Sequence, residues 1–231
     1  MASLSFLFDY NGVLVDDEQV HLAAFRDVLS PLGITIGDED YNARYLGFDD
    51  VGAFRAILAD HHQPASDARV AGLVAAKKPN YLRRAKHELN VFEGAGELLR
   101  RLADQGAVIG IVSGALRDEI TLGLSRLNAA DAVSFVVSAE DTQACKPDPE
   151  GYRIGKQRLA AITSASPHTV VIEDSLAGIA AAQAAELPCI AVAHSYPESE
   201  LQTARASLVL PRIADLTDGA LAELATRLYA H

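Results

Sequence analysis

Short apolar runs alternate with helical segments through the later part of the chain, and this alternation restricts the possible folds strongly. The apolar runs lie at 107–113, 133–137, 169–173, 189–193 and 208–210. Segments whose apolar residues recur at helical spacing lie between the first four of these runs and after the last one. Strands that alternate with helices of about 10–15 residues are typical of a parallel sheet with helices on both faces. The sequence therefore predicts an α/β fold with a doubly wound, Rossmann-like parallel sheet.

Another strand is predicted at the start of the chain, ahead of a long helical block. Residues 4–8 form an apolar run, and a turn around Gly12 closes it. Residues 17–91 then show helical spacing with no strand pattern. We expect a core domain made of residues 1–16 and 92–231, with an all-helical cap domain inserted at 17–91. The two crossings between them are natural hinges for a lid.

Composition and charge exclude several classes of protein. The chain has 231 residues, 49% of them hydrophobic, and a net charge of −11, so broad binding to nucleic acid or to anionic membranes is not expected. It lacks a basic targeting signal and an apolar run of roughly 18 residues. The two cysteines, Cys145 and Cys189, have no metal-ligand spacing. We expect a cytoplasmic protein that is a monomer or a weak dimer.

Polar residues follow the strands of the predicted sheet where such a fold places a site. The groups are Asp9 with Asn11, Ser113 with Gly114, Lys146 in a loop, and Glu173 with Asp174. Clustered carboxylates make an oxygen-rich site that suits Mg²⁺ and substrate phosphate. A serine with turn amides can hold phosphate oxygens, and a lysine can neutralise developing charge. Together the four groups predict phosphate chemistry at one edge of the sheet.

These four groups, in this order, resemble the motifs of the haloacid dehalogenase superfamily. The resemblance is to the branch with a helical cap, which includes β-phosphoglucomutase and small sugar-phosphate phosphatases, and it covers essentially the whole chain. Asp9-Tyr-Asn-Gly-Val is similar to the nucleophile motif, Ser113 to the Ser/Thr motif and Lys146-Pro to the lysine motif. Glu173-Asp174-Ser, followed by Gly178, is similar to the acidic motif.

The resemblance implies a phosphatase that acts on a small phosphorylated metabolite and uses Mg²⁺. Asp9 would attack phosphorus and become an aspartyl phosphate. The metal would be held by Asp9, the backbone carbonyl of Asn11 and Asp174, with Glu173 on a metal-bound water or nearby. Such a reaction depends mainly on positioning and on charge neutralisation.

Substrate-binding residues are implied in both domains. Ser113 and Lys146 would bind the transferring phosphoryl group, with Gly114 in the same turn. In the cap, His21 lies in an Asp-Glu-x-x-His stretch similar to that of the mutase branch, and Lys77 lies in a lysine-rich stretch that can face the substrate. A surface histidine and a solvated helix lysine are the plain alternatives for these two.

The chain departs from the family pattern at Asn11, where the family has a second aspartate. In the family this carboxylate protonates the leaving oxygen and later accepts a proton from water, and an amide does neither. Loss of such a group typically costs about 10²–10⁴ in rate. Three explanations are open: an engineered change that traps a complex, a natural variant, or a binding protein with little turnover. In a natural variant the proton would come from Asp16, Asp17, Glu18 or His21.

Two further functions are weighed against the phosphatase. A sugar phosphomutase needs a cation in the cap for a second phosphate, but the aligned loop at 45–50 is acidic, so Arg44 or Arg55 would have to substitute. A pseudo-phosphatase would bind a phosphorylated ligand with little turnover. Asn11 bears on the choice between phosphatase and pseudo-phosphatase, because an amide there permits phosphate binding but cannot transfer the protons that hydrolysis needs.

Overall fold

The computed structural model describes residues 4–163 and 168–229 and divides into two compact units. The core unit comprises Met1–Val15 and Val91–His231, and the cap unit comprises Asp16–Asn90. The expected boundaries at 16/17 and 91/92 lie one residue further along the chain.

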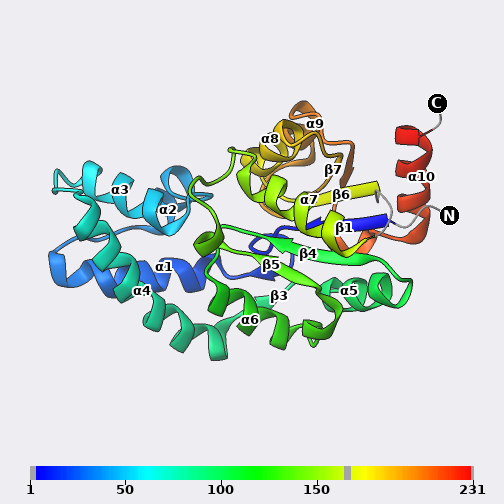
Figure 1. Cartoon of the computed structure of the whole chain (residues 1–231). Coiled ribbons are helices and arrows are strands. Elements are labelled where there is room, and N and C mark those ends of the chain that lie inside the picture. Colours follow the sequence, from blue (N-terminus) through cyan, green and yellow to red (C-terminus); the bar gives the residue numbers. More distant parts are fainter. Residues whose placement is uncertain (1–3, 164–167, 230–231) are drawn as a thin grey trace. The chain divides into compact units, whose positions relative to one another are not determined.

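A six-stranded parallel sheet forms the centre of the core unit (Figure 1). The strand order is β5-β4-β1-β6-β7-β8. The chain therefore runs outward from β1 in one direction through β4 and β5, and in the other through β6 to β8. Ligands of such sheets bind beyond the carboxyl ends of the strands, where the order reverses. In this chain the reversal occurs beside β1. The strands are β1 (Leu4–Phe8), β4 (Val108–Val112), β5 (Phe135–Val137), β6 (His168–Glu173), β7 (Cys189–Val192) and β8 (Leu208–Leu210).

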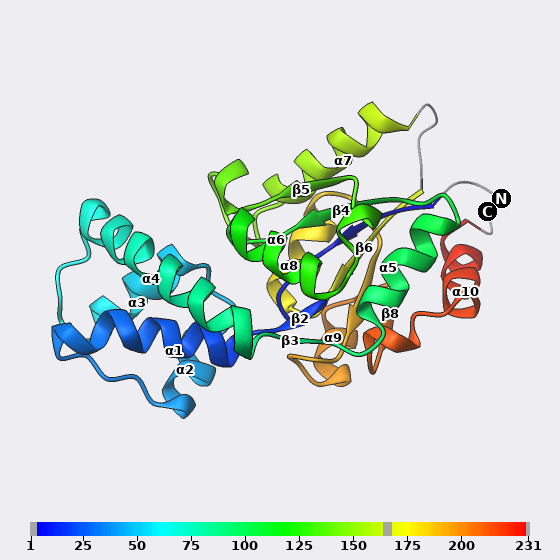
Figure 2. The same ribbon diagram turned by 90° about the horizontal axis from the view of Figure 1, so that it is seen from below.

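Helices cover both faces of this sheet, so the inner strands β4, β6 and β7 are almost entirely buried, while the edge strands β5 and β8 are only partly buried. Figures 1 and 2 show α5 and α6 on one face and α7 and α8 on the other. Leu7 and Val171 point to the second face and pack with Tyr152 and Ile179 in one hydrophobic cluster. The core helices are α5 (Ala95–Asp104), α6 (Arg117–Arg126), α7 (Glu150–Ile162), α8 (Leu176–Ala184), α9 (Glu198–Thr203) and α10 (Asp218–Tyr229). Short 3₁₀ turns lie at Ala130–Ala132, Ala139–Asp141 and Ile213–Asp215.

The cap unit is helical and has its own hydrophobic core. The longest helix, α4, packs against both α1 and α3. Phe25, Phe54 and Ile57 are buried in the cluster that these helices enclose. The cap elements are α1 (Glu18–Leu29), a 3₁₀ turn (Ser30–Leu32), α2 (Asp38–Arg44), α3 (Asp50–Asp60) and α4 (Asp67–Glu88).

Two very short strands carry the chain between the units. β2 (Val15–Asp16) and β3 (Asn90–Val91) pair as a two-stranded sheet. The amide of Phe92 also donates to the carbonyl of Leu14, at 3.1 Å. The outgoing and returning chains are therefore hydrogen-bonded to each other where they leave the core.

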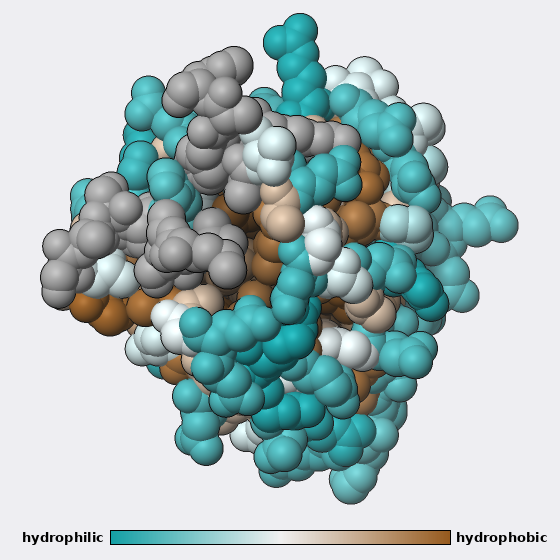
Figure 3. Space-filling model, turned by 90° about the vertical axis from the view of Figure 1, so that its right-hand side faces the viewer, coloured by the Kyte–Doolittle hydropathy of each residue, from teal (hydrophilic) through white to brown (hydrophobic). Residues whose placement is uncertain are grey.

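Figure 3 shows one face of the molecule. Among the described residues on this face, hydrophilic ones cover most of the surface, and hydrophobic ones form smaller areas between them. In the described part of the chain, no helix combines the length and the apolar character needed to cross a lipid bilayer.

Candidate active site

Asp9 is the first residue after β1, and its position is fixed by both backbone and side chain. Its amide donates to the carbonyl of Ile172 at 2.9 Å, which continues the pairing of β1 with β6 by one residue. The side chain is buried, with Oδ1 2.8 Å from the Nζ of Lys146. The carboxylate therefore lies at the reversal of strand order with a cation beside it.

Glu173 ends β6 and accepts hydrogen bonds on both carboxylate oxygens. Oε1 accepts from Lys146 Nζ at 2.6 Å and from the hydroxyl of Tyr152 at 2.7 Å. Oε2 accepts from the amide of Asp174 at 3.1 Å and from the Ser175 hydroxyl at 3.0 Å. A Cβ on Gly178 would lie 1.8 Å from Oε1, so the glycine lets α8 approach this carboxylate. Glu173 therefore holds Lys146 and the turn that leads into α8.

Asp174 lies next to the turn at Gly12, and the fit between them is close. Gly12 has a φ of 73°, and a Cβ there would lie 1.9 Å from Oδ2 of Asp174. The position thus requires glycine for its backbone conformation and for space. Oδ2 of Asp174 accepts a short hydrogen bond from the Ser195 hydroxyl.

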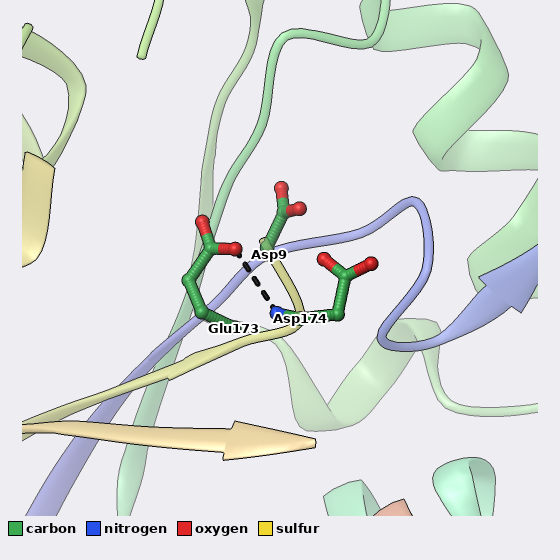
Figure 4. Close-up of side chains that lie close together, drawn as sticks. All are labelled: Asp9, Glu173 and Asp174. Carbon is green, nitrogen blue, oxygen red and sulfur yellow. Dashed lines mark hydrogen bonds between the residues drawn. The ribbon is translucent and has the colours of Figure 1, made fainter. Parts of the chain in front are cut away.

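The three carboxylates form one cluster. Asp9, Glu173 and Asp174 each offer an oxygen, and these oxygens lie within 4.8 Å of one another. Figure 4 shows the three side chains rising from the ends of β1 and β6. All the donors are hard oxygens and two belong to aspartates, the kind of set that Mg²⁺ prefers. The residues present therefore fit a magnesium site.

Ser113 and Asn11 lie beside this cluster and contact each other. Ser113 follows β4, and its hydroxyl donates to Oδ1 of Asn11 at 3.3 Å while it accepts from the amide of Ala115 at 3.2 Å. Gly114, also expected to bind substrate, is exposed in the same turn, just before α6. The structure thus brings Asp9, Asn11, Ser113 and the carboxylates of β6 to one edge of the sheet.

Burial and charge set the protonation of this edge. Burial raises the pKa of Asp9 to about 6, although Lys146 opposes the shift. Burial and the neighbouring Glu173 and Asp9 raise the pKa of Asp174 well above its usual value. Burial alone would also raise the pKa of Glu173, but the charge and hydrogen bond of Lys146 keep it below the usual value. The cluster holds more negative charge than Lys146 balances, which favours a bound cation.

The two cap residues expected to face the substrate lie in a polar network inside the cap. Lys77 is fully buried, with its Nζ bonded to Asp50 and 2.7 Å from Nδ1 of His21. Nε2 of His21 lies 3.1 Å from Asp17, which also accepts from the hydroxyl of Tyr81. Lys77 is thus a buried, paired cation, unlike the solvated helix lysine of the plain alternative. Whether either residue binds substrate stays a prediction.

Three residues of the core site have no counterpart in the sequence predictions. Tyr152 comes from α7, while His194 and Ser195 come from the turn after β7. Nothing in their local sequence distinguishes them from ordinary buried or loop residues. For His194 and Ser195 the strand order supplies the signal, because β7 is the neighbour of β6 and its carboxyl end therefore lies beside Glu173 and Asp174.

Comparison with known proteins gives relatives along most of the chain. Residues 6–192 match the family model described as haloacid dehalogenase-like hydrolase. Validoxylamine A 7'-phosphate phosphatase of Streptomyces hygroscopicus subsp. limoneus is 27% identical over 198 residues, which cover 86% of this chain and 89% of that protein. Protein SUPPRESSOR OF QUENCHING 1, chloroplastic, of Arabidopsis thaliana is 31% identical over 217 residues, 91% of this chain but 20% of that much longer protein.

Solved structures of similar fold cover nearly the whole chain. β-Phosphoglucomutase from Clostridium difficile has a TM-score of 0.84 with 21% identity and full coverage of both chains. CbbY from Rhodobacter sphaeroides, solved in complex with phosphate, has a TM-score of 0.81 with 22% identity, covering 94% of this chain and 96% of that one. These likenesses confirm the predicted Rossmann-like core. On the family match and the fold together, the chain belongs to the haloacid dehalogenase-like hydrolases.

Proposed function

We propose that the protein is a Mg²⁺-dependent phosphatase that acts on a small phosphorylated metabolite, with Asp9 as the nucleophile. The observation that carries the proposal is the position of the Asp9 carboxylate, 2.8 Å from Lys146 and within the oxygen cluster formed with Glu173 and Asp174. Relatives named as phosphatases of phosphorylated small molecules support the substrate class.

Asp9, Asp174 and the backbone carbonyl of Asn11 would hold Mg²⁺, with Glu173 nearby. When bound, the metal would neutralise charge on the phosphoryl oxygens. Lys146 would add a second positive charge on the side of Asp9. The Ser113 hydroxyl and the turn amides after it would hold a further phosphoryl oxygen.

In the first step, a carboxylate oxygen of Asp9 attacks phosphorus, and the bond from phosphorus to the substrate oxygen breaks. The products are an aspartyl phosphate and the departing alkoxide, aryloxide or carboxylate. An alkoxide needs a proton as it leaves, whereas an acyl or aryl leaving group needs little. Asn11 donates hydrogen bonds but has no proton to transfer. We therefore expect a first step that is fast only with good leaving groups.

In the second step, water attacks phosphorus, and the bond to the Asp9 oxygen breaks. The products are inorganic phosphate and free Asp9, and the proton of the water must pass to a base. Asn11 is not such a base, so this step is slow for every substrate unless another group accepts the proton. The aspartyl phosphate is therefore expected to accumulate.

Mass spectrometry of the intact protein tests this scheme. After mixing with Mg²⁺ and acetyl phosphate, we expect a protein of higher mass by one phosphoryl group, located on Asp9 by peptide mapping. The control variant Asp9→Asn should stay unmodified. Steady multiple turnover without any phosphorylated Asp9 would contradict the scheme.

The Asn11→Asp variant tests the role of residue 11. Because the variant regains a general acid and base, hydrolysis of p-nitrophenyl phosphate is expected to rise by about 10²–10⁴. Asp16→Asn is the companion variant, since Asp16 is exposed while Asp17 and Glu18 already accept hydrogen bonds from tyrosines in the cap. If Asp16→Asn lowered the rate of the unmodified protein and Asn11→Asp gave no gain, Asp16 would be the proton carrier.

The phosphomutase remains the second candidate, because β-phosphoglucomutases are among the relatives and structural neighbours. The two arginines that could supply its cap cation are both paired: Arg44 with Asp60 and Arg55 with Asp67, each at 2.5 Å. These pairs favour the phosphatase. Conversion of a hexose 1-phosphate to its 6-phosphate, followed by NMR, would instead support the mutase.

A binding protein with little turnover is the non-enzymatic alternative. Mg²⁺-dependent release of phosphate from p-nitrophenyl phosphate distinguishes the two, with Asp9→Asn as the control. Equal signals from the two proteins would favour the binding protein, and a clear loss in Asp9→Asn would favour the enzyme.

A further inference from the structure

The turn after β7 reaches the proposed metal site through Ser195. Its hydroxyl donates to Oδ2 of Asp174, and among the described residues it is the hydrogen-bond donor to that carboxylate. The same hydroxyl oxygen would lie 3.0 Å from a Cβ on Gly12. Ser195 is therefore packed between a proposed metal ligand and the turn that follows the nucleophile.

His194, the preceding residue, contacts the turn that follows Asp9. Its Nδ1 lies 2.7 Å from the carbonyl oxygen of Gly12, and its Nε2 lies 3.2 Å from the amide nitrogen of Ile213. A carbonyl only accepts and an amide only donates, so these partners require a hydrogen on Nδ1 and a lone pair on Nε2. The ring thus bridges the turn after Asp9 and the 3₁₀ turn after β8.

An aromatic contact completes the support of this ring. The ring of His194 stacks on that of Phe92, with centroids 3.9 Å apart and an angle of 21° between the planes. Phe92 is hydrogen-bonded through its amide to Leu14, in the segment that continues from Gly12. The ring is therefore held on a face and at both nitrogens, so its orientation is well determined.

We propose that His194 and Ser195 are positioning residues for the divalent cation. Ser195 holds the carboxylate of Asp174 in one orientation, and His194 holds the carbonyl of Gly12, next to Asn11 whose own carbonyl is a proposed ligand. The inference rests on the proposed function. It adds the end of β7 to the four groups that the sequence indicates.

Ser195 and His194 are expected to strengthen metal binding because they restrict the motion of the Asp174 side chain and of the Gly12 carbonyl. Without the Ser195 hydroxyl, the Asp174 side chain can rotate, and this freedom must be lost again each time a cation binds. Loss of residues that orient metal ligands typically weakens binding by roughly 10–100-fold. At saturating metal the ligand is held by the cation itself, so the maximal rate should change little.

Direct binding of Mn²⁺, followed by electron paramagnetic resonance on the protein without substrate, tests the proposal. We expect Ser195→Ala to raise the dissociation constant for Mn²⁺ by roughly tenfold or more. Ser195→Thr keeps the hydroxyl, so its dissociation constant should be close to that of the unmodified protein. Ser199→Ala is the matched control, because Ser199 is exposed in α9 of the same region. The Mg²⁺ concentration for half-maximal activity should rise in parallel, with kcat at saturation nearly unchanged.

The second pair of variants addresses His194. His194→Ala should also weaken Mn²⁺ binding, whereas His194→Asn keeps an N–H donor near the place of Nδ1 and should recover part of the affinity. Mn²⁺ binding by Ser195→Ala as tight as by the unmodified protein would overturn the inference and leave the proposed function standing. Failure of the unmodified protein to bind Mn²⁺ would overturn the proposed function itself.

Discussion

Asp141 joins three parts of the core through one carboxylate. It lies in the turn after β5, where its side chain accepts from the amide and the hydroxyl of Ser138, each at 2.9 Å. Arg158 of α7 donates to it at 3.0 Å, and Arg117 of α6 is also paired with it. Burial would raise the pKa of Asp141, but these hydrogen bonds and the charge of Arg117 lower it to about 2.

This low pKa gives a pH-dependent contribution to stability. The folded pKa lies below the ordinary value of 3.8, so the carboxylate stabilises the fold above about pH 4 and loses this effect as the pH falls towards 2. Asp141→Asn should lower the free energy of unfolding at pH 7 by about 1–2 kcal/mol. This is less than the full pKa shift of Asp141 would give, because the side chain is partly exposed and solvent screens its charge.

Urea unfolding of Asp141→Asn at several pH values measures this. The difference from the unmodified protein should shrink between pH 4 and pH 2. Asp131→Asn, at an exposed position, is the control and should change little. A difference that stays constant over this range would contradict the assignment of the effect to the Asp141 charge.

At the residue scale, the sequence predicts well only what local pattern encodes. An apolar run that ends in a carboxylate or a serine is visible in sequence, so the approach of Asp9, Ser113 and Asp174 to one another could be expected. The burial of Lys77 against Asp50 could not, because helical spacing alone does not tell a solvated lysine from a paired one. The contact of His194 with Gly12 depends on which strand ends are neighbours, and local sequence holds no signal for it.

At the scale of elements, the start of α3 offers a clear test of a helix cap. Asp49 precedes the helix, and its Oδ1 accepts from the amide of Gly52 at 2.7 Å. Asp49→Ala removes this bond and should lower the free energy of unfolding by about 1 kcal/mol. Asp49→Asn keeps the acceptor and should cost only a few tenths. Thermal and urea unfolding check both; an equal loss in the two variants would mean that charge, not capping, dominates.

The elements that the sequence predicts occur in the structure in the expected order, but some bounds differ, and α9, β2 and β3 are additional. The strand expected at 133–137 begins two residues later, at Phe135. The sequence gives no clear signal for α9, because its six residues are mostly polar and only Leu201 is buried. It gives none for the pairing of β2 with β3, because two-residue strands are too short to show a period.

At the scale of the whole molecule, each unit has a core of its own. Phe54 of the cap is fully buried, in an edge-on contact with Phe25 at 4.8 Å between centroids. Phe54→Ala should destabilise the cap by about 3–5 kcal/mol. Because the cluster around Phe54 contains cap residues only, hydrogen exchange should accelerate in the cap helices much more than in β4 and β6.

Hydrogen-exchange mass spectrometry of Phe54→Ala tests whether the cores are independent. Phe48→Ala is the control for loss of an aromatic ring, since Phe48 is 54% exposed. Equal acceleration in the cap and in the sheet would contradict independence and indicate that the chain unfolds as one cooperative unit.

The position of β1 in the sheet has a consequence for how the protein is made. β1 pairs with β4 at Val108 to Ile111 and with β6 at His168 to Ile172. A chain that grows from its amino end therefore exposes one of the two central strands before either partner of that strand exists. One edge of β1 stays open until the ribosome has made β6, and an open apolar strand invites wrong pairing. The helices of the cap follow β1 directly and can form before β4 and β6 are made. Chaperone dependence should therefore be greatest for nascent chains that stop before β6.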